Sequence, residues 1–271
     1  MTRFPRILLA ILSVGILPAT AEPQVVTPTA PPPNPKDYRR IAYPWKKDIT
    51  ATVFWIGEKP GGRNNTSNHH SSWDREWQKN FGGYDNPDPA ARTGFRPTNF
   101  VPKLNPFYIA LPYNDCLNHA AHKSEAAAAI PWFHRYSPRP GQSVCKGRWI
   151  QIISGNRTCY AQWEDCGPWV TDDWQYVFGN RPPRNTQNSK AGIDVSPAVR
   201  DQLGIKSGSK IHWRFVELSN VPRGPWSQLG TNNPFVNPKV NPDLLAAQRY
   251  NTYLRELRDK AYQQKDTSRS R

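Results

Sequence analysis

The sequence predicts a mainly β domain over residues 45–218, folded as a small β-barrel with long loop insertions and short helices. Short runs that alternate in hydrophobicity, and are rich in β-branched and aromatic residues, recur through this segment. The stretches between these runs are rich in Gly, Pro, Asn and Ser, which favour turns and loops. The helical patterns inside the segment are short, so short strands closing on themselves account for it best.

The N-terminus, residues 1–21, has the organisation of a secretory signal peptide. Arg3 and Arg6 supply a positive start, residues 7–17 form an apolar run, and 19–21 (Ala-Thr-Ala) form a small-residue cleavage site. The apolar run is too short to span a bilayer. We therefore expect the mature protein to be secreted or periplasmic and associated with the cell wall.

Residues 22–44 follow as a Pro-rich linker without periodicity. In the barrel segment, strands are predicted at 49–56, 107–111, 148–153, 158–165 and 210–216. Helices are predicted at 73–79, at 124–130 with Ser124 as N-cap, and at 197–203 between an N-cap at Ser196 and a stop at Gly204.

The C-terminal segment, 219–271, begins with a Pro- and Asn-rich stretch and continues as a helix from about residue 241. Its apolar stripe predicts docking onto the barrel, and its basic face offers contact with an anionic surface instead. The final residues, 263–271, are charged and are expected to be disordered. The stripe consists of Ala247, Tyr250, Leu254, Leu257 and Ala261, and the basic face of Arg249, Arg255, Arg258 and Lys260.

Charge and aromatic content narrow the class of partner. The formal net charge is +15, which favours an anionic partner such as a wall polymer, a membrane surface or nucleic acid, or serves solubility alone. Eleven tryptophans in a hydrophilic chain predict some exposed rings that stack on sugars or bases. No Gly-rich phosphate loop is present, so we expect no nucleotide or other cofactor.

The four cysteines are expected to form disulfides because the chain is expected to be exported. Three pairings are possible. A hairpin about Gly155-Asn156 puts Cys145 opposite Cys166, whereas a weak internal repeat between 110–116 and 161–166 brings Cys116 near Cys166. We adopt the second reading, Cys116–Cys166 with Cys145–Cys159. No Cys-x-x-Cys pair is present, so no metal site is expected.

Two aspartates are the candidate catalytic residues. A β-patterned run ends in Asp165 just before Gly167-Pro168 turn the chain, and Asp194 lies just ahead of a helix start. Two carboxylates near one groove are what acid/base cleavage of a glycosidic bond requires. The structural alternative is that Asp165 caps the turn and Asp194 caps the helix.

Three motifs resemble the second half of the double-psi β-barrel, the fold of the rare lipoprotein A family, expansins, barwin and glycoside hydrolase family 45. They are Asp165-Cys-Gly-Pro-Trp169, the segment 192–204 that begins Gly-Ile-Asp-Val-Ser-Pro, and the strand 208–216. Residues 50–58, which end in Trp-Ile-Gly-Glu, resemble the family's opening strand ending in Tyr-Gly-Glu. The resemblance covers 49–58 and 107–217, leaves 59–106 and 170–190 as insertions, and implies a six-stranded double-psi β-barrel.

The resemblance assigns roles to both aspartates. Asp165 matches the aspartate before the Gly-Pro turn that is implicated in glycan cleavage by rare lipoprotein A. Asp194 matches the aspartate of the His-Phe-Asp motif in expansins and family 45 enzymes, and the catalytic aspartate of membrane-bound lytic transglycosylase A. This chain has Gly192-Ile193 in place of His-Phe, and Cys in place of Arg after Asp165. His119 and His122 are candidates, by order alone, for the family's first-half histidine.

The leading hypothesis is a monomeric protein acting on cell-wall polysaccharide, most plausibly a peptidoglycan lytic transglycosylase or an inverting glycosidase. Asp194 would be the acid, Asp165 the base or an orienting partner, and Asp115, by the repeat, would lie across the groove. The alternatives are a non-catalytic expansin-like module and, less favoured, a barwin-like binder of nucleic acid. The expected sugar-contacting residues, each with core packing or a surface loop as its alternative, are Tyr113, Trp163, Trp169, Trp174, His69 and His70.

Overall fold

The computed structural model describes residues 31, 32, 34, 43–61, 66–136 and 138–269. The chain divides after Pro31, and the second unit is Pro32–Arg271. The predicted signal peptide and most of the predicted linker lie outside the described residues. All elements described below belong to the second unit.

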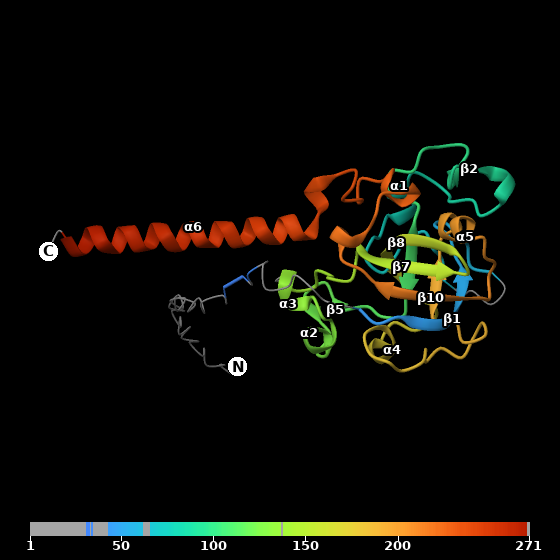
Figure 1. Cartoon of the computed structure of the whole chain (residues 1–271), viewed down its shortest axis with the longest axis horizontal. Coiled ribbons are helices and arrows are strands. Elements are labelled where there is room, and N and C mark those ends of the chain that lie inside the picture. The colour runs from blue at the N-terminus through green and yellow to red at the C-terminus, as the bar shows by residue number, and fades with distance from the viewer. Residues whose placement is uncertain (1–30, 33, 35–42, 62–65, 137, 270–271) are drawn as a thin grey trace, which may run out of the picture. The chain divides into compact units, whose positions relative to one another are not determined.

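Six strands form a closed barrel in the order β1-β10-β7-β8-β4-β9 (Figure 1). The small barrel predicted from the sequence is therefore confirmed, and five of its strands lie within a few residues of their predicted positions. The sixth, β9, was not predicted as a strand. The bounds are β1 Lys46–Val53, β4 Tyr108–Leu111, β7 Arg148–Ser154, β8 Arg157–Cys166, β9 Ile193–Val195 and β10 Ser209–Phe215.

The barrel is mixed, with two parallel pairs, β1 with β9 and β4 with β8. The other four pairs are antiparallel. Strands β7 and β8 form the hairpin predicted about Gly155-Asn156, with Arg148 opposite Trp163 at one end and Ser154 opposite Arg157 at the turn. Gly155 has a φ of 57°, a left-handed conformation that suits glycine in a tight turn.

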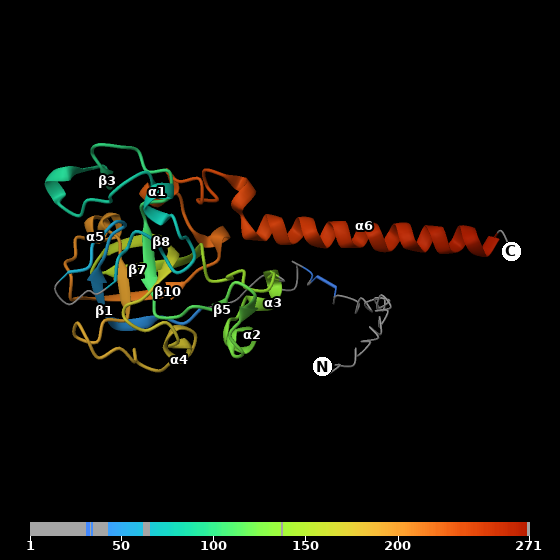
Figure 2. The same ribbon diagram turned by 180° about the vertical axis from the view of Figure 1, so that it is seen from behind.

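Short helices and hairpins decorate the barrel (Figure 2). The mainly β prediction holds for the barrel but not for the whole chain, because α6 alone contributes 28 residues. The helices are α1 Trp77–Phe81, α2 Ala126–Ala129, α3 Phe133–Tyr136, α4 Trp174–Val177, α5 Pro197–Leu203 and α6 Pro242–Arg269. The 3₁₀ turns are η2 Pro89–Ala91, η3 Leu218–Asn220, η4 Pro225–Ser227 and η5 Pro238–Val240. Two hairpins pair β2 Arg92–Thr93 with β3 Arg96–Pro97, and β5 Cys116–Asn118 with β6 Ala121–His122.

Helix α5 begins and ends as predicted. The Ser196 hydroxyl accepts a hydrogen bond from the Val199 backbone N–H at 3.3 Å, and Gly204 ends the helix with a φ of 62°. The Ser196 hydroxyl also donates to the Pro106 carbonyl at 2.7 Å, which ties the start of α5 to the chain entering β4. The predicted cap Ser124 is wrong, because α2 has Glu125 at its N-cap position and no side-chain cap.

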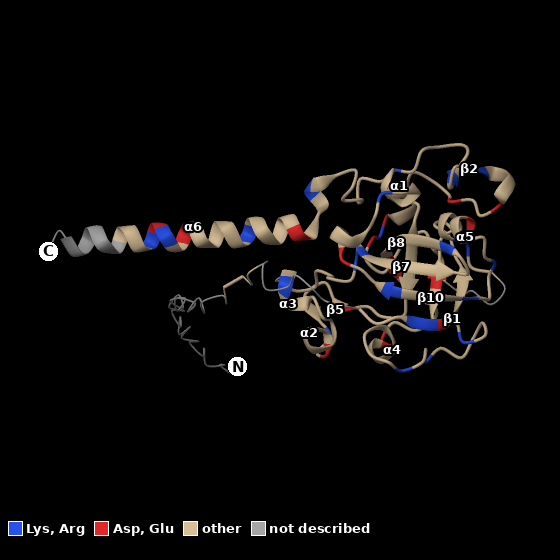
Figure 3. Cartoon of the chain, in the orientation of Figure 1, with Lys and Arg blue, Asp and Glu red and all other residues tan. Residues whose placement is uncertain are grey.

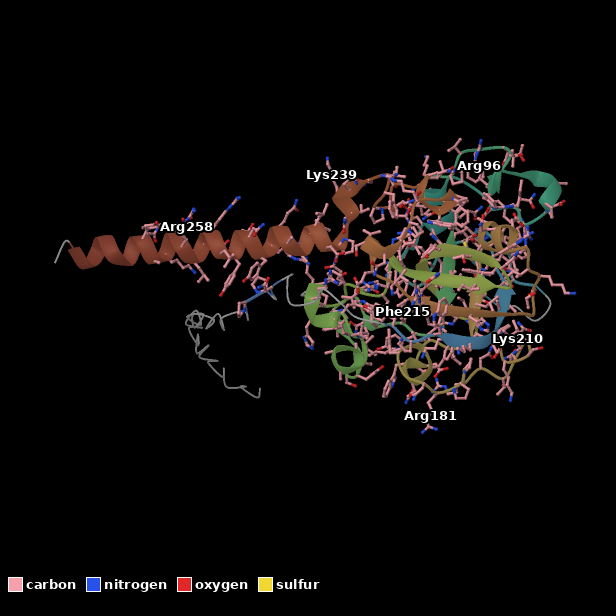
Figure 4. All side chains as sticks on the ribbon, viewed as in Figure 1. Arg96, Arg181, Lys210, Phe215, Lys239 and Arg258 are labelled. Atoms are coloured by element: carbon pink, nitrogen blue, oxygen red, sulfur yellow. The ribbon has the colours of Figure 1, made fainter. Side chains whose placement is uncertain are left out.

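Aromatic rings fill the barrel. Trp163 and Trp213 are fully buried, and Phe215 (labelled in Figure 4) packs against both of them. The Phe178 ring stacks on Phe215 at a centroid distance of 5.8 Å. A second cluster lies outside the barrel and consists of Phe54, Ile56, Trp77, Phe81, Tyr108 and Ala110. Alternate residues of β4 therefore face different clusters, because successive side chains of a strand point to opposite faces.

A buried cation, Arg148, lies at the first residue of β7. The Arg148 guanidinium donates to Glu217 Oε1 and to the Tyr43 hydroxyl, each at 2.7 Å, and lies 4.2 Å from the Trp132 ring centroid. Arg135 binds the other carboxylate oxygen of Glu217 at 2.9 Å. The side chains of this network come from β7, from α3 and from the segments that precede β1 and η3.

None of the four cysteines is bonded to another, which corrects the disulfide prediction. The preferred pair Cys145–Cys159 is also excluded by distance. Cys159 lies opposite Ile152 in the middle of the hairpin, four residues from Trp163 along β8, whereas Cys145 lies beyond the Trp163 end. Those four residues span about 13 Å, against roughly 4.4–6.8 Å between the Cα atoms of a disulfide. Cys166, by contrast, lies close enough to Cys145 to act on it electrostatically.

The C-terminal helix contacts the barrel unit through its first turns. Arg249 donates to the Tyr136 carbonyl at 2.6 Å, and α6 also contacts η5. Leu254 and Leu257 of the predicted docking stripe are 45% and 44% exposed, so this part of the stripe is not buried. The helix continues to Arg269 and includes most of the segment expected to be disordered. Within the described residues, no helix is both long and apolar enough to cross a membrane.

Replacing Glu217 with Gln should lower the free energy of unfolding by about 3 kcal/mol near neutral pH, because Arg148 would lose the charge that compensates its burial. Burial alone would raise the pKa of Glu217, but Arg148 and the bond from Tyr43 hold it below its usual value of 4.5. A carboxyl with a lowered pKa stabilises the folded state above the unfolded pKa, and this contribution is lost as the pH falls through the folded pKa.

Urea unfolding followed by tryptophan fluorescence at pH 7 and below pH 4 measures this effect. The difference between wild type and Glu217→Gln should shrink at the lower pH. Glu76→Gln is the matched control, because its ion pair with Lys79 is exposed and worth little. An equal loss of stability in both variants would contradict the conclusion that Glu217 compensates the buried charge of Arg148.

Candidate functional site

The two predicted aspartates lie on the strands that neighbour β4, opposite the same residue of β4. Ala110 pairs with Asp165 of β8 and with Asp194 of β9. Asp194 in turn pairs with Thr52 of β1. Paired residues of neighbouring strands point to the same face of a sheet, so these four residues form one row on the outer face of the barrel. The two aspartates are therefore brought together, as predicted.

A β-bulge in β8 aims Asp165 outward. Trp163 pairs with Ile109 and faces the aromatic core, and regular alternation would turn Asp165 to the core as well. The register shifts between Ile109 and Ala110. Glu164 is therefore left without a partner in β4, and Asp165 lies opposite Ala110. The extra residue, Glu164, is buried and accepts a hydrogen bond from Asn232 at 3.0 Å.

A cavity of 230 Å³ opens over this row. Its lining is more polar than apolar and contains three carboxylates, those of Glu58, Asp165 and Asp194. Trp169 supplies an aromatic wall. The remaining lining residues are Thr52, Val53, Phe54, Thr66, Asn68, Ala110, Cys166, Gly167, Pro168, Asn188 and Ser207.

Asp194 has the properties of a proton donor. Burial raises its pKa from 3.8 to about 7, with further increases from the nearby carboxylates of Asp165 and Glu58. A hydrogen bond from the Thr52 hydroxyl to Oδ1 acts in the opposite direction. A Cβ atom at Gly167 would lie 3.2 Å from Oδ2, so glycine keeps this oxygen accessible. The alternative that Asp194 caps α5 is wrong, because Ser196 is the cap.

Asp165 is the more easily ionised member of the pair. Burial raises its pKa to about 6, less far than for Asp194, because two backbone N–H groups bind its Oδ1. They belong to Ser72 and Cys166 and both lie at 2.8 Å. The bond from Cys166 shows that Asp165 also serves the turn, as the structural alternative proposed. The Ser72 side chain also forms a hydrogen bond with this carboxyl group and lowers its pKa.

Glu58 is the acid that the sequence reasoning missed. It lines the cavity, is partly buried, and accepts a hydrogen bond from Asn68 Nδ2 at 2.9 Å. A signal was present, because Glu58 ends the segment that resembles the family's opening strand with its terminal Tyr-Gly-Glu. Its proximity to Asp194 follows from the barrel closure that pairs β1 with β9.

Asp115 does not line the cavity, although the internal repeat placed it across the groove. Its side chain is fully buried. Oδ1 accepts a hydrogen bond from the Ser143 hydroxyl at 2.6 Å, and Oδ2 accepts one from the Val144 N–H at 2.7 Å. We therefore do not retain Asp115 as a catalytic residue of this site.

Of the four aromatic residues predicted to contact sugar, Trp169 alone lines the cavity. Its φ of 63° lies in the left-handed region and follows the cis peptide between Gly167 and Pro168. Tyr113 and Trp163 are fully buried, and Trp174 packs against the core. These three have the core-packing role that was their alternative.

The histidines have positions that the sequence alone did not reveal. His69 and His70 are exposed; His69 contacts Gln78, and His70 lies close enough to Asp165 to lower its pKa. His119 and His122 lie outside the cavity lining. No histidine side chain fits at Gly192, where the family motif has one, because a Cβ there would lie 2.6 Å from the Tyr176 hydroxyl.

A comparison of the chain with models of known protein families finds no match, and a search of curated proteins finds none either. Function must therefore be inferred from the arrangement of these residues. Two carboxyl groups of unequal pKa facing one polar cavity can exchange protons with a bound substrate near neutral pH.

Replacing Asp194 with Asn should stabilise the protein at pH 8 by on the order of 2 kcal/mol, because it removes a buried charge. The pKa of Asp194 in the folded state, about 7, lies above the ordinary value of 3.8. Between these values the folded chain holds a proton that the unfolded chain has lost, so rising pH destabilises the wild type. The advantage of the variant should therefore grow from pH 4 to pH 7 and then level off.

Urea unfolding of both proteins at pH 4, 6 and 8 measures the advantage. Asp259→Asn serves as control because that aspartate is 60% exposed. An advantage that does not depend on pH would show that Asp194 is not the group that titrates.

Proposed function

We propose that this protein is exported and cleaves cell-wall polysaccharide, with peptidoglycan as its substrate, as a lytic transglycosylase or an inverting glycosidase. The observation that carries the proposal is the row in which Asp165 and Asp194 flank Ala110 beneath one polar cavity. Their unequal pKa values, about 6 and about 7, match a base and an acid.

The double-psi form of the barrel is part of the proposal. Two features support it: the barrel contains two parallel strand pairs, and the segments with the family resemblance form β1, β8, β9 and β10. In this arrangement the carboxyl end of β8 and the short strand β9 both border β4.

The two aspartates lie on strands separated by β4, and this placement fits a mechanism without a covalent intermediate. Two strand spacings of about 4.8 Å place their Cα atoms roughly 9–10 Å apart. Retaining enzymes bring the two carboxyl groups to about 5 Å, whereas inverting enzymes leave about 6.5–9.5 Å for a water molecule. Asp194 would protonate the leaving glycosidic oxygen, and Asp165 would accept a proton from the attacking water.

In the transglycosylase version the 6-hydroxyl of the sugar replaces the water as the nucleophile. Asp194 again protonates the leaving oxygen, and Asp165 accepts the proton of the 6-hydroxyl. Asp165, held by two N–H groups, would then also stabilise the positive charge that develops on the sugar ring. Trp169 provides a face on which a sugar ring stacks. Glu58 acts on the chemistry through its charge, which favours the protonated form of Asp194.

Replacing Asp194 with Asn should reduce product release from purified peptidoglycan by about 10²–10⁴-fold, because the leaving oxygen loses its proton donor. Asp165→Asn should also reduce it, and Asp259→Asn should leave it unchanged. Mass spectrometry of the released fragments identifies the reaction, since anhydro-sugar ends mark a transglycosylase and reducing ends a hydrolase.

The same assay separates the competing functions. Pelleting with peptidoglycan without release, unaffected by Asp194→Asn, would mean an expansin-like binder. The basic residues spread over the barrel and α6 (Figure 3) also fit nucleic acid, and steeply salt-dependent binding to RNA without glycan binding would favour that function. Either outcome would overturn the proposal.

The rate of cleavage should follow a bell-shaped pH profile, because the dyad must carry one proton in the active form. Its limits should lie near the pKa values of about 6 for Asp165 and about 7 for Asp194. Glu58→Gln removes a negative charge that raises the pKa of Asp194, so the alkaline limit should move to lower pH. Glu76→Gln, on the exposed end of α1, should leave both limits in place, and an unshifted limit in Glu58→Gln would contradict this assignment.

A further inference from the structure

A second cluster of reactive side chains lies outside the cavity, on the β5–β6 hairpin. Cys116 of β5 pairs directly with His122 of β6, and Asp115 precedes Cys116 in the chain. A carboxylate oxygen of Asp115, the sulfur of Cys116 and a ring nitrogen of His122 all lie within 4.8 Å of one another. Three ligand types from one short hairpin are thereby brought to one point.

Hydrogen bonds around the cluster already orient these groups for a metal ion. His122 Nε2 lies 2.9 Å from the Gln142 carbonyl, and a carbonyl only accepts, so Nε2 carries the proton and Nδ1 keeps a free lone pair. Asp115 Oδ2 accepts one bond, from the Val144 N–H, and retains a second lone pair. Asp115 Oδ1 accepts from the Ser143 hydroxyl and from the Cys116 thiol at 3.8 Å, and the thiol bond is lost when a metal ion replaces the thiol proton. Such outer bonds to histidine and carboxylate are typical of metal ligands.

The loop that supplies these outer bonds is packed tightly against the hairpin. A Cβ at Gly141 would lie 2.2 Å from the His119 carbonyl, and the Cys116 sulfur contacts the Gly141 carbonyl at 3.3 Å. Two further thiols lie close by, because Asp115, Cys116 and Cys166 all act electrostatically on Cys145. The fourth cysteine, Cys159, is on the far part of the β7–β8 hairpin.

We propose that Asp115, Cys116 and His122 bind a divalent cation of the zinc class. A set made of one thiolate, one imidazole and one carboxylate matches the ligands of zinc, whereas magnesium and calcium take oxygen ligands. Binding replaces the thiol proton of Cys116, which passes to the solvent. A water molecule completes the coordination.

The sequence, which has no Cys-x-x-Cys pair, led us to expect no metal site. The proposed site also has a consequence for the cavity. Asn114 Oδ1 accepts hydrogen bonds from the Cys116 N–H at 3.0 Å and from Trp73 Nε1 at 2.9 Å. Trp73 follows Ser72, whose N–H binds Asp165, so a metal on the hairpin would steady the loop that holds this aspartate.

The test uses the mature protein, reduced with a phosphine and with its free thiols counted. Equilibrium dialysis against Zn²⁺ should give one ion per chain, and Co²⁺ should produce a thiolate-to-cobalt charge-transfer band. His122→Gln should weaken Zn²⁺ binding at least 100-fold, and Cys116→Ser should abolish the cobalt band. His134→Gln, an exposed histidine of α3, is the matched control and should behave as wild type.

Thermal unfolding with and without Zn²⁺ provides a second readout, with a raised midpoint expected in wild type and His134→Gln but not in His122→Gln. Three results would overturn the proposal: no binding by the fully reduced protein, unchanged binding in His122→Gln, or thiols held in a disulfide that excludes the ion. None of them overturns the proposed glycan cleavage, because Asp165 and Asp194 are not ligands of this site.

Discussion

The pairing of β4 with both β8 and β9 is the constraint on which the site depends. Ala110 has Asp165 on one side and Asp194 on the other, so backbone hydrogen bonds fix the positions from which the two side chains extend. A slip of one residue in either pairing would turn an aspartate into the aromatic interior, where an unpaired charge is costly. The bulge at Glu164 is what gives β8 the required register.

The packing of the barrel stabilises the folded state, whereas the buried carboxyl groups of the site destabilise it. The interior of the barrel is filled by aromatic rings such as Trp163 and Phe215, and the charge of Arg148 is compensated by a buried ion pair with Glu217. Against this, partly or fully buried carboxyl groups with raised pKa values disfavour folding at neutral pH. Such an exchange of stability for chemistry is common at functional sites. Burial of Asp194 within this scaffold is the main cause of its raised pKa.

Local features were predictable because each depends on neighbours in the chain. The β7–β8 hairpin follows from two alternating runs about Gly155, and α5 follows from Ser196, a proline and Gly204. The family resemblance also identified Asp165 and Asp194. Strand β9 was missed because three residues carry too little periodicity to distinguish a strand from a loop.

The sequence by itself determined a small barrel, its hairpin, its capped helix and the two aspartates. Only the tertiary structure decided which other residues lie beside the two aspartates. It brought Glu58 to the cavity, withdrew Asp115 from it, and separated Cys145 from Cys159. The physical reason is that these relations depend on barrel closure and strand register, which bring together residues far apart in the chain and leave no local pattern.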